Sequence, residues 1–534
     1  MESFKTFTKF SGMKPNASKC EISGIGAKRG EYVALCGMRS VDLSSESIKI
    51  LGIYYSYNDE VTKEKNYLEL IKNIETIVNI WKMRNLTLLG KIIIFKTLIL
   101  SKIVFLSFLT SVPNLIIDQL EVIQKRFLWD GKRAKVKHQT LIGPDEKGGL
   151  KSVDIKSRIN ALQLSWIKRL FDNNDHDWKY IPQYLIQKYF GHQKMFYSNF
   201  EAKLPDEMLS FYKTIIGKWS TFSLCNPLTV ECVYTQRIWY NHFIKINNST
   251  FFYKKFAKKG VQFVKDFYSR NGSVKSWQQF KNNFNCIENM FFPWRQIVEA
   301  IPILWKRMIN EDQGNGINNG ICDQNFIRVT RQLTLDKMTS KEFYSIIVTK
   351  LYLRPTSETT IENLLNVENV NWSKIYNLSG IITIDTYSRM FNFKLNHNIL
   401  YLNKSLTKMG ILNNRLCSFC KTTDETPIHL FSECLISIQI WREIQINFIN
   451  VINLPDLTPQ SAFFSFYNIQ KDNIIINHVL LIFKMTLYCY RKKGTCSFQN
   501  VLRNIIKVKN IENDITILNE KQHNFHLQKW ANIV

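Results

Sequence analysis

The segment Cys417-Ser-Phe-Cys-Lys-Thr-Thr-Asp-Glu-Thr-Pro-Ile-His-Leu-Phe-Ser-Glu-Cys434 governs how the C-terminal part of this chain folds. Cys417 and Cys420 are separated by two residues, so one tight turn carries both thiols. His429 and Cys434 follow at an interval that can close a tetrahedral site, and three Cys with one His satisfy a structural zinc ion without leaving a position for water. We therefore predict a zinc site that holds the fold and does not catalyse. The alternative is a chance Cys-x-x-Cys, with His429 exposed and Cys434 buried.

The spacing of the last two ligands sets a condition on the local backbone. His429 and Cys434 are five residues apart, which on a regular helix places them about 140° from each other. Pro427 can begin a short helix that presents His429. That helix must end or bend before Cys434 if both side chains bind one ion.

The charge of the chain favours polyanionic partners. Its 534 residues include 71 Lys and Arg against 44 Asp and Glu, a formal net charge of +27. Such a field attracts phosphate polymers, because lysine and arginine release the condensed counterions. An excess of lysine that only keeps a large protein soluble is the alternative. Together with the zinc motif, the charge indicates a nucleic-acid-binding protein.

The composition indicates a folded protein of several domains inside the cell. Apolar residues make up 45% of the chain, and its eleven cysteines are an odd, scattered set typical of a reducing compartment. The N-terminus has no apolar run of signal-peptide length, so we expect a nuclear or cytoplasmic protein that is not secreted. The longest apolar stretch, Ile92–Leu109, contains Lys96 and Lys102, which favours a buried helix and no membrane contact.

Periodicity predicts a helix-rich chain with a few strands near its start. Residues 1–57 contain short apolar runs punctuated by glycine, and Ile48–Tyr55 is rich in β-branched and aromatic residues, which is typical of a strand. A helical pattern begins near Glu60, and the glycine- and asparagine-rich stretch Glu311–Gly320 predicts a linker. Further helices are expected at about Thr87–Leu109, Ile116–Trp129, Ile159–Phe171 and Asn473–Tyr490.

The densest group of cations surrounds the segment Gly131–His138. We predict that these side chains contact phosphates, which position a protein on nucleic acid. Trp129 lies beside them and either stacks on a base or packs in a core, and its helical spacing favours the core. The cations are Lys125, Arg126, Lys132, Arg133, Lys135 and Lys137.

Several motifs resemble the reverse transcriptases of LINE-type (non-LTR) retrotransposons. Phe10-Ser-Gly-Met-Lys-Pro-Asn16 with Ser18-Lys19 is similar to the segment after the catalytic Asp-Asp loop, and Ile50-Leu-Gly-Ile53 is similar to the primer-grip strand. Other residues resemble the thumb of these enzymes and the segment beyond it. They are Trp81, Arg84-Asn-Leu-Thr-Leu-Leu-Gly-Lys91, Phe127-Leu-Trp129, Gly148-Gly-Leu150, Asn160-Ala161 and Trp166-Ile167. A last group resembles the zinc-binding region of these enzymes and comprises Lys394-Leu-Asn-His397, Leu412 and Cys417 through Trp441.

The resemblance implies roles for particular residues. Cys417, Cys420, His429 and Cys434 fall on the family's ligand positions, Lys91 lies in the thumb motif, and Lys19 occupies a position near the incoming phosphates. Without its palm partners, Lys19 is more simply explained as a solvated lysine. We include both lysines among the predicted nucleic-acid contacts.

The catalytic acids of the family have no counterpart. Polymerisation needs carboxylates that hold two Mg²⁺ ions, and the sequence contains no Asp-Asp dipeptide. Asp42 and Asp59 are better explained as turn and helix-start residues. We expect a C-terminal part of such an enzyme that is inactive alone, with structural Zn and with Mg only if a catalytic palm is supplied.

The predicted fold class is α-rich α+β, with a truncated palm remnant, a helical thumb, a helical middle region and a small zinc-knuckle module. Its expected partners are an RNA template and an RNA/DNA or DNA duplex. Two alternatives are an enzyme subunit completed by a separate palm-bearing polypeptide and a decayed element with no selected role. The predicted divisions are 1–57 (palm remnant), 58–171 (thumb and following segment), 172–310 (connecting region), 311–384 (linker and approach), 385–445 (zinc-binding region) and 446–534 (C-terminal helices).

Overall fold

The structure is a computed structural model, and it divides into two compact units. Unit 1 comprises Met1–Ile103, Asn114–Ile155 and Val348–Val534, and unit 2 comprises Val104–Pro113 and Lys156–Ile347. We describe each unit by itself. The described residues are 2–13, 16, 19–24, 38–172, 174–190, 199–201, 203–224, 229–269, 271–312, 328–330, 333–334, 338–450, 452–466 and 474–531.

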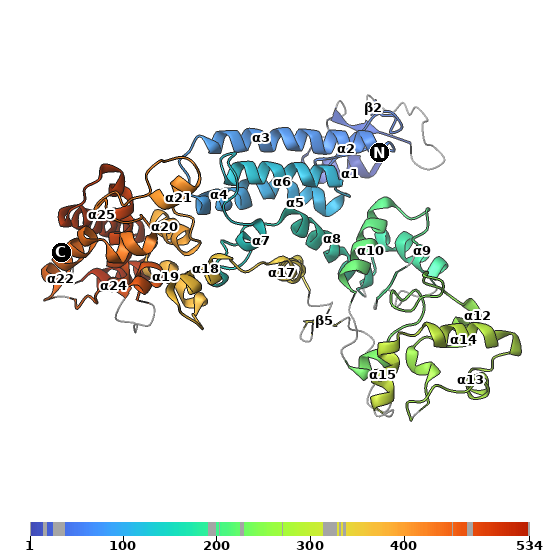
Figure 1. The fold of residues 1–534 in the computed structure, drawn as a ribbon. Helices are drawn as coiled ribbons and strands as arrows, with labels where there is room; N and C mark the ends of the chain where they lie inside the picture. Colours follow the sequence, from blue (N-terminus) through green and yellow to red (C-terminus); the bar gives the residue numbers. More distant parts are fainter. Residues whose placement is uncertain are drawn as a thin grey trace. The chain divides into compact units, whose positions relative to one another are not determined.

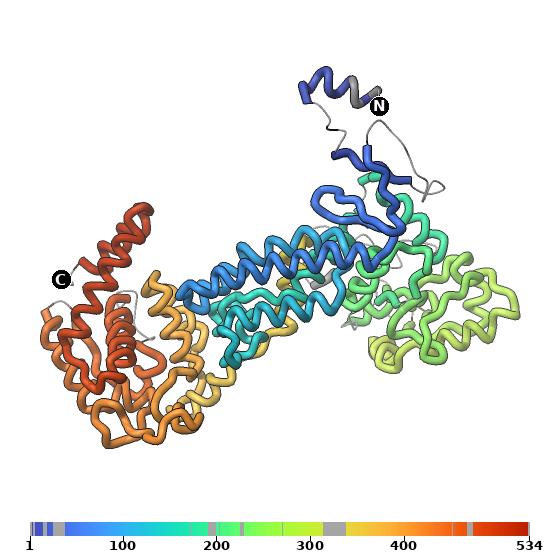
Figure 2. Tube along the Cα trace, turned by 90° about the horizontal axis from the view of Figure 1, so that it is seen from above, coloured from blue at the N-terminus to red at the C-terminus, as the bar shows by residue number. Residues whose placement is uncertain are grey.

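The first part of unit 1 is a set of helices preceded by two small sheets. Thr87 begins the second long helix as expected, because its side chain accepts a hydrogen bond from the backbone N–H of Gly90 at 3.1 Å. Helices α3, α4 with its continuation, and α6 lie side by side (Figures 1 and 2). The elements are α1 (Glu2–Ser11), β1 (Glu21–Ile22), β2 (Arg39–Ser40), β3 (Ile48–Ile50), β4 (Ile53–Tyr55), α2 (Asp59–Lys63), η3 (Glu64–Leu68), α3 (Glu69–Lys82), α4 (Leu88–Ile94), η4 (Phe95–Ile99), α5 (Leu100–Leu109), α6 (Asn114–Leu128), α7 (His138–Leu141) and η5 (Asp145–Lys147). From Val104 on, α5 belongs to unit 2.

The apolar run Ile48–Tyr55 is a hairpin, so the prediction of a single strand through it was wrong. Strands β3 and β4 pair antiparallel around Leu51 and Gly52, whose φ angles are +50° and +88°. Two successive left-handed residues are the geometry of a two-residue hairpin turn. The buried Asn66 then ties β4 to the following helix, since its amide both accepts from the N–H of Tyr54 and donates to its carbonyl.

The Gly148-Gly149 pair is required by close packing. Gly148 has a φ of +77°, and a Cβ at Gly149 would lie 1.9 Å from the carbonyl oxygen of Gly143. The ring of Tyr376 covers the same turn, so a side chain at either glycine would collide with it or with the backbone. His397 lies beside this turn, with its Nε2 2.8 Å from the carbonyl oxygen of Gly148.

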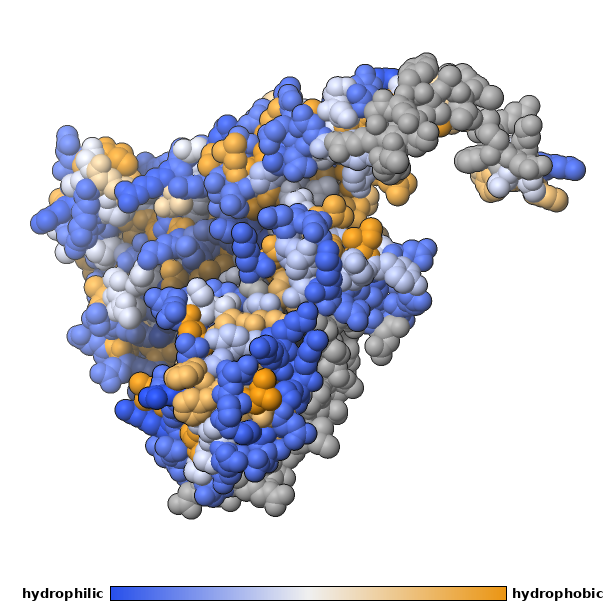
Figure 3. Space-filling model, turned by 90° about the vertical axis from the view of Figure 1, so that its right-hand side faces the viewer, coloured by the Kyte–Doolittle hydropathy of each residue, from blue (hydrophilic) through white to orange (hydrophobic). Residues whose placement is uncertain are grey.

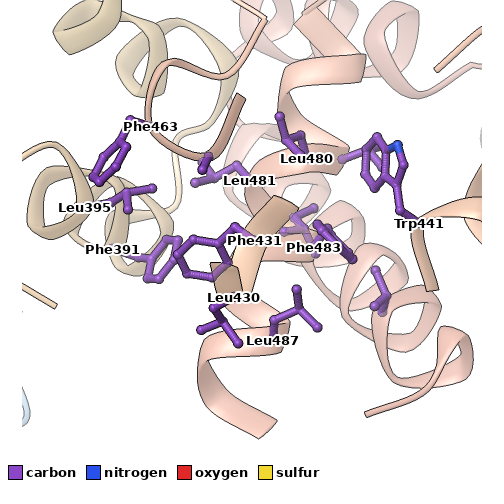
Figure 4. Packing of buried hydrophobic residues seen from close by; sticks show 14 of the residues in the cluster. Phe391, Leu395, Leu430, Phe431, Trp441, Phe463, Leu480, Leu481, Phe483 and Leu487 are labelled. Carbon is purple, nitrogen blue, oxygen red and sulfur yellow. The ribbon is translucent and has the colours of Figure 1, made fainter. Parts of the chain in front are cut away.

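The last part of unit 1 is an all-helical region with its own core. Figure 4 shows Phe391 beside Phe431, with ring centroids 6.1 Å apart, among side chains of the central helix α24. The helix expected at about Asn473–Tyr490 is α24, for which the described residues begin at Ile474. The elements are α18 (Ser357–Leu365), α19 (Trp372–Ile382), α20 (Thr386–Asn396), α21 (Asn403–Lys408), η11 (His429–Glu433), α22 (Leu435–Phe448), α23 (Pro459–Phe464), α24 (Ile474–Tyr490), η13 (Arg491–Lys493), α25 (Phe498–Thr516) and α26 (Glu520–Trp530).

Unit 2 is built around an aromatic core. Its buried cluster includes Trp219, Tyr234 and Phe280, and Trp166 donates its indole N–H to the carbonyl oxygen of Phe108 at 2.7 Å. Glu311 and Asp312 are the last residues of α15, so the predicted linker does not begin at Glu311, and its remainder, 313–320, lies outside the described residues. The elements are α8 (Ile155–Phe171), η6 (Asp177–Lys179), α9 (Tyr180–Phe190), α10 (Ser210–Phe222), α11 (Val230–Tyr234), α12 (Lys254–Lys258), η8 (Val264–Phe267), α13 (Trp277–Phe284), η9 (Glu288–Met290), α14 (Phe291–Ala300), α15 (Ile303–Asp312), β5 (Arg328–Thr330), β6 (Leu333–Thr334) and α17 (Ser340–Leu351).

Two helical stretches in the described residues are long and apolar enough to cross a membrane. They are Leu88–Leu109 and Ile474–Lys493, of which 39% and 67% of the most apolar window is buried inside the structure. Core helices pass the same test, so these stretches are weak evidence for a membrane span. The face drawn in Figure 3 is largely hydrophilic, with hydrophobic residues in scattered groups.

Candidate metal centre

The first two candidate ligands lie on a tight turn. The backbone N–H of Lys421 donates to the carbonyl oxygen of Cys417 at 3.0 Å, and the N–H of Cys417 donates to the carbonyl oxygen of Thr423 at 2.7 Å. Lys421 adopts a left-handed φ of +58°, which reverses the chain directly after Cys420. The turn therefore directs both thiols to the same side, as the Cys-x-x-Cys spacing predicted.

The other two ligands are placed by a helix that stops and restarts. The helix begins at Pro427, and its π-helical segment η11 carries His429 at its start. Cys434 has an extended backbone, with a φ of −66° and a ψ of +127°, and serves as the N-cap of α22. The predicted break before Cys434 is confirmed, and it turns this thiol back toward His429.

The four ligand atoms form one compact group. The three sulfurs and the His429 nitrogen all lie within 4.8 Å of one another. The Sγ atoms of Cys417 and Cys434 are 3.9 Å apart, and the Sγ of Cys420 is 3.2 Å from Nε2 of His429. Tetrahedral zinc with Zn–S bonds of about 2.3 Å requires sulfurs roughly 3.8 Å apart. The donor set therefore fits zinc, and the sulfur separation is far too long for a disulfide bond.

Backbone N–H groups prepare the thiols to bind as thiolates. The hydrogen bond with Cys417 lowers the pKa of Cys434 to about 5 although burial opposes the shift, and the N–H groups of Ile436 and Ser437 at the start of α22 act in the same direction. The same pairing, together with burial, raises the pKa of Cys417. Cys434 is consequently the thiol of this pair that carries negative charge first.

The remaining thiol and the imidazole are oriented by threonines. Burial opposes ionisation of Cys420, but hydrogen bonds from the hydroxyl and backbone N–H of Thr422 lower its pKa to about 7. Thr423 Oγ1 lies 3.0 Å from Nδ1 and 3.1 Å from Nε2 of His429, so this hydroxyl does not distinguish the two ring nitrogens. Nε2 lies 3.2 Å from the Sγ of Cys420 and is the nitrogen that faces this thiol.

A buried ion pair anchors the turn to the helices around it. The carboxylate of Glu425 is fully buried and lies 2.7 Å from Nη1 of Arg491, which directly follows α24. Its other oxygen accepts from the backbone N–H and the hydroxyl of Ser418, between the first two ligands. Arg491 also donates to the carbonyl oxygen of Tyr401. The pair could not be predicted from the sequence, because its members are distant in the chain.

The comparison with known families agrees with this geometry. A family model described as zinc-binding in reverse transcriptase matches residues 360–441. All four candidate ligands lie inside the matched stretch. The chain therefore contains a region related to reverse transcriptases, and its Cys/His group points to a structural zinc ion. The match begins upstream of residue 385, and the six predicted divisions of the chain stay a prediction.

The predicted nucleic-acid contacts fall into three environments. Lys91 is buried and pairs with Asp130 at 2.5 Å, Arg126 pairs with Glu75 at 3.1 Å, and Lys19 is exposed on a short turn. The loop after α6 begins where Asp130 and Gly131 adopt left-handed backbones. Besides Arg126, the exposed cations that follow α6 or end it are Lys125, Lys132, Arg133, Lys135 and Lys137.

The structure brings part of this group to one pocket. Lys91, Lys132, Arg133 and Lys135 line a pocket with a volume of about 310 Å³, and Lys394 of α20 lines it as well. Lys394 was not among the residues predicted to contact nucleic acid. The half-buried Trp129 packs on the apolar cluster under the loop, which is the core role that its spacing favoured.

Proposed function

We propose that this chain is the zinc-containing, nucleic-acid-binding C-terminal part of a LINE-type reverse transcriptase. The observation that carries the proposal is the Cys417, Cys420, His429 and Cys434 group inside the stretch that matches the zinc-binding family of reverse transcriptases. In this proposal zinc holds the turn, η11 and the start of α22 together. It takes no part in chemistry, because four protein ligands complete its coordination.

Nucleic acid would be held by the helices before the zinc region. We assign the thumb to α3, the long helix α4–α5 and α6, and the palm remnant to the strands before them. Helix α3 contacts α6 and η4, and α6 contacts α4. The net charge of +27 and the exposed cations after α6 support a phosphate-binding role. The partners would be template RNA and the RNA/DNA or DNA duplex, and their binding should weaken linearly in log salt.

Polymerisation would require carboxylates that this sequence does not offer as an adjacent pair. With no Asp-Asp dipeptide, the chain has no counterpart to the family's two-metal site. We therefore propose that it binds nucleic acid without extending a primer. Adding a separate palm-bearing polypeptide would supply the carboxylates and the Mg²⁺ that they hold.

The test combines binding with primer extension on the purified chain. We expect salt-dependent binding to RNA and to an RNA/DNA duplex by filter retention, and no nucleotide incorporation with Mg²⁺ or Mn²⁺. Incorporation by the chain alone would contradict the proposed inactivity. Absence of binding at low salt would contradict the proposed function as a whole.

A further inference from the structure

One pocket in unit 1 gathers cations from two distant segments of the chain. The loop after α6 contributes Lys132, Arg133 and Lys135, and α20, inside the stretch matched by the zinc-binding family, contributes Lys394. Val136 of the loop shares a buried apolar cluster with Met390 and Phe393 of α20, which brings the two segments together. The pocket therefore belongs to neither segment alone.

The charges in this pocket are unbalanced. Its one lining carboxylate, Asp130, is engaged by Lys91 at 2.5 Å. Among the residues that the structure describes, no ion pair is formed by the other four lining cations. These are Lys132, Arg133, Lys135 and Lys394.

Two of these cations repel each other directly. Burial lowers the pKa of Lys394, and the neighbouring Lys135 lowers it further. Lys135 Nζ lies 3.4 Å from the ring centroid of Tyr401, whose face offers partial compensation. Holding like charges together costs free energy that a bound anion between them would recover. The arrangement is thus suited to an anion.

The walls and size of the pocket favour one unit of a single strand. Apolar side chains such as Leu128, Met390 and Phe393 line it, and a low-dielectric wall strengthens an ionic contact. Its volume of about 310 Å³ is at the lower end of the range for small-ligand sites. Trp129 and Tyr401 complete the wall, with Trp129 packed on the apolar cluster and Lys135 over the ring of Tyr401, so the pocket is suited to a phosphate group rather than to a stacked base. A duplex would need an extended surface instead.

We propose that this pocket binds a phosphodiester of a single nucleic-acid strand, with Lys135 and Lys394 on the phosphate and Arg133 and Lys132 on its neighbours. The inference rests on the proposed function and names a site for it. It also joins the zinc-binding region to the basic loop through one strand. Loss of Lys394 should therefore weaken binding although this residue is distant from the loop in sequence.

The test is fluorescence anisotropy on the full chain with a short labelled oligo-uridylate, an oligo-thymidylate and a duplex of equal length, over a series of salt concentrations. The pocket variant is K135Q/K394Q. The control is K374Q/K408Q, which removes the same charge from exposed lysines on α19 and α21 outside the pocket. Zinc content and thermal melting of each variant establish that it is folded.

We expect K135Q/K394Q to weaken single-strand binding roughly tenfold near 0.1 M salt and to reduce the slope of log affinity against log salt by about 1.4, at about 0.7 per phosphate contact. The control should stay within about twofold of wild type. Its melting temperature should equal that of the wild type, whereas the pocket variant should melt at the same temperature or higher, since a repulsion is removed.

Three outcomes would overturn the inference. An equal loss of affinity in the pocket variant and the control would show that only the net charge matters. A larger loss of affinity for the duplex than for the single strands would show that the pocket binds duplex. Displacement by millimolar inorganic phosphate at constant ionic strength would make it a free-anion site. In each case wild type still binds nucleic acid, so the proposed function survives, whereas failure of wild type to bind any probe would overturn both.

Discussion

The zinc region of unit 1 and the core of unit 2 are stabilised in different ways. Around the metal centre, order depends on a few polar groups, namely the four ligands and the buried Glu425–Arg491 pair. The buried cluster of unit 2 is large and apolar, with Trp219 and Phe280 among its largest members. Where a few strong contacts hold a region, removing one of them should destabilise the whole region. Where many small contacts do so, removing one should lower the stability only slightly. The two regions should therefore respond differently to single substitutions.

Removing one zinc ligand should have the largest effect. Cys417→Ser should abolish zinc binding and unfold the region from the turn through α22, because structural zinc contributes on the order of 10 kcal/mol of binding free energy that is also folding free energy. Hydrogen exchange followed by mass spectrometry should show lost protection there, with unit 2 unchanged. Cys232→Ser, at an exposed cysteine of unit 2, is the matched control. Equal zinc content in the two variants would exclude the proposed site.

Breaking the buried ion pair should come next. Arg491→Met leaves the fully buried Glu425 carboxylate without its cation, which typically costs about 3–5 kcal/mol. The urea concentration at the midpoint of unfolding of the zinc region should fall accordingly. It is measured on the full chain by hydrogen exchange and mass spectrometry of the peptides that cover this region. Arg415→Met removes an exposed partner of Asp424 and should cost less than about 1 kcal/mol. A similar loss in both variants would show that burial of the pair does not matter.

The same contrast explains how much could be predicted from sequence. The ligand set follows from spacing because Cys417 and Cys420 share a turn, and the start of the helix at Thr87 follows from a local cap. Local rules failed at Leu51-Gly52, where a left-handed pair folds an apolar run back on itself. They also gave no sign of long-range partners. The Glu425–Arg491 pair and the pocket shared by Lys135 and Lys394 exist only once distant segments pack together.

Lowering the pH should reduce the free energy of unfolding more in unit 1 than in unit 2, and this effect should be smaller than the two above. His397 is buried beside the Gly148 turn, and burial lowers its pKa to about 4, below the ordinary value of 6.5. The unfolded chain therefore takes up a proton first, so stability is fully present above pH 6.5 and is lost as the pH falls toward 4. At pH 5 the loss is about 2 kcal/mol, at roughly 1.4 kcal/mol per pH unit.

His397→Gln should remove this dependence. Urea midpoints of wild type and variant, measured at pH 7 and pH 5, give a difference in which the acid sensitivity of the zinc ligands cancels. The variant is less stable at pH 7, because it loses the contact with Gly148, but it should lose about 2 kcal/mol less than wild type on going to pH 5. Unit 2 offers a comparison, since none of the buried histidines among the described residues lies in it. Parallel losses in wild type and variant would contradict the assignment to His397.

The smallest effect tests whether ordinary packing differs between the regions at all. Ile216 in α10 of unit 2 and Ile444 in α22 of the zinc region are both fully buried. Shortening either to Val removes one methylene and should cost about 0.5–1.5 kcal/mol in its own region. Both costs can be measured on the full chain from the urea midpoints of the peptides that cover each region, followed by hydrogen exchange and mass spectrometry. Equal costs would mean that the zinc region is sensitive to single substitutions because of its ligands and its ion pair, since its apolar contacts contribute as much as those of unit 2. A much larger cost at Ile444 would instead attribute this sensitivity to the packing around the metal centre.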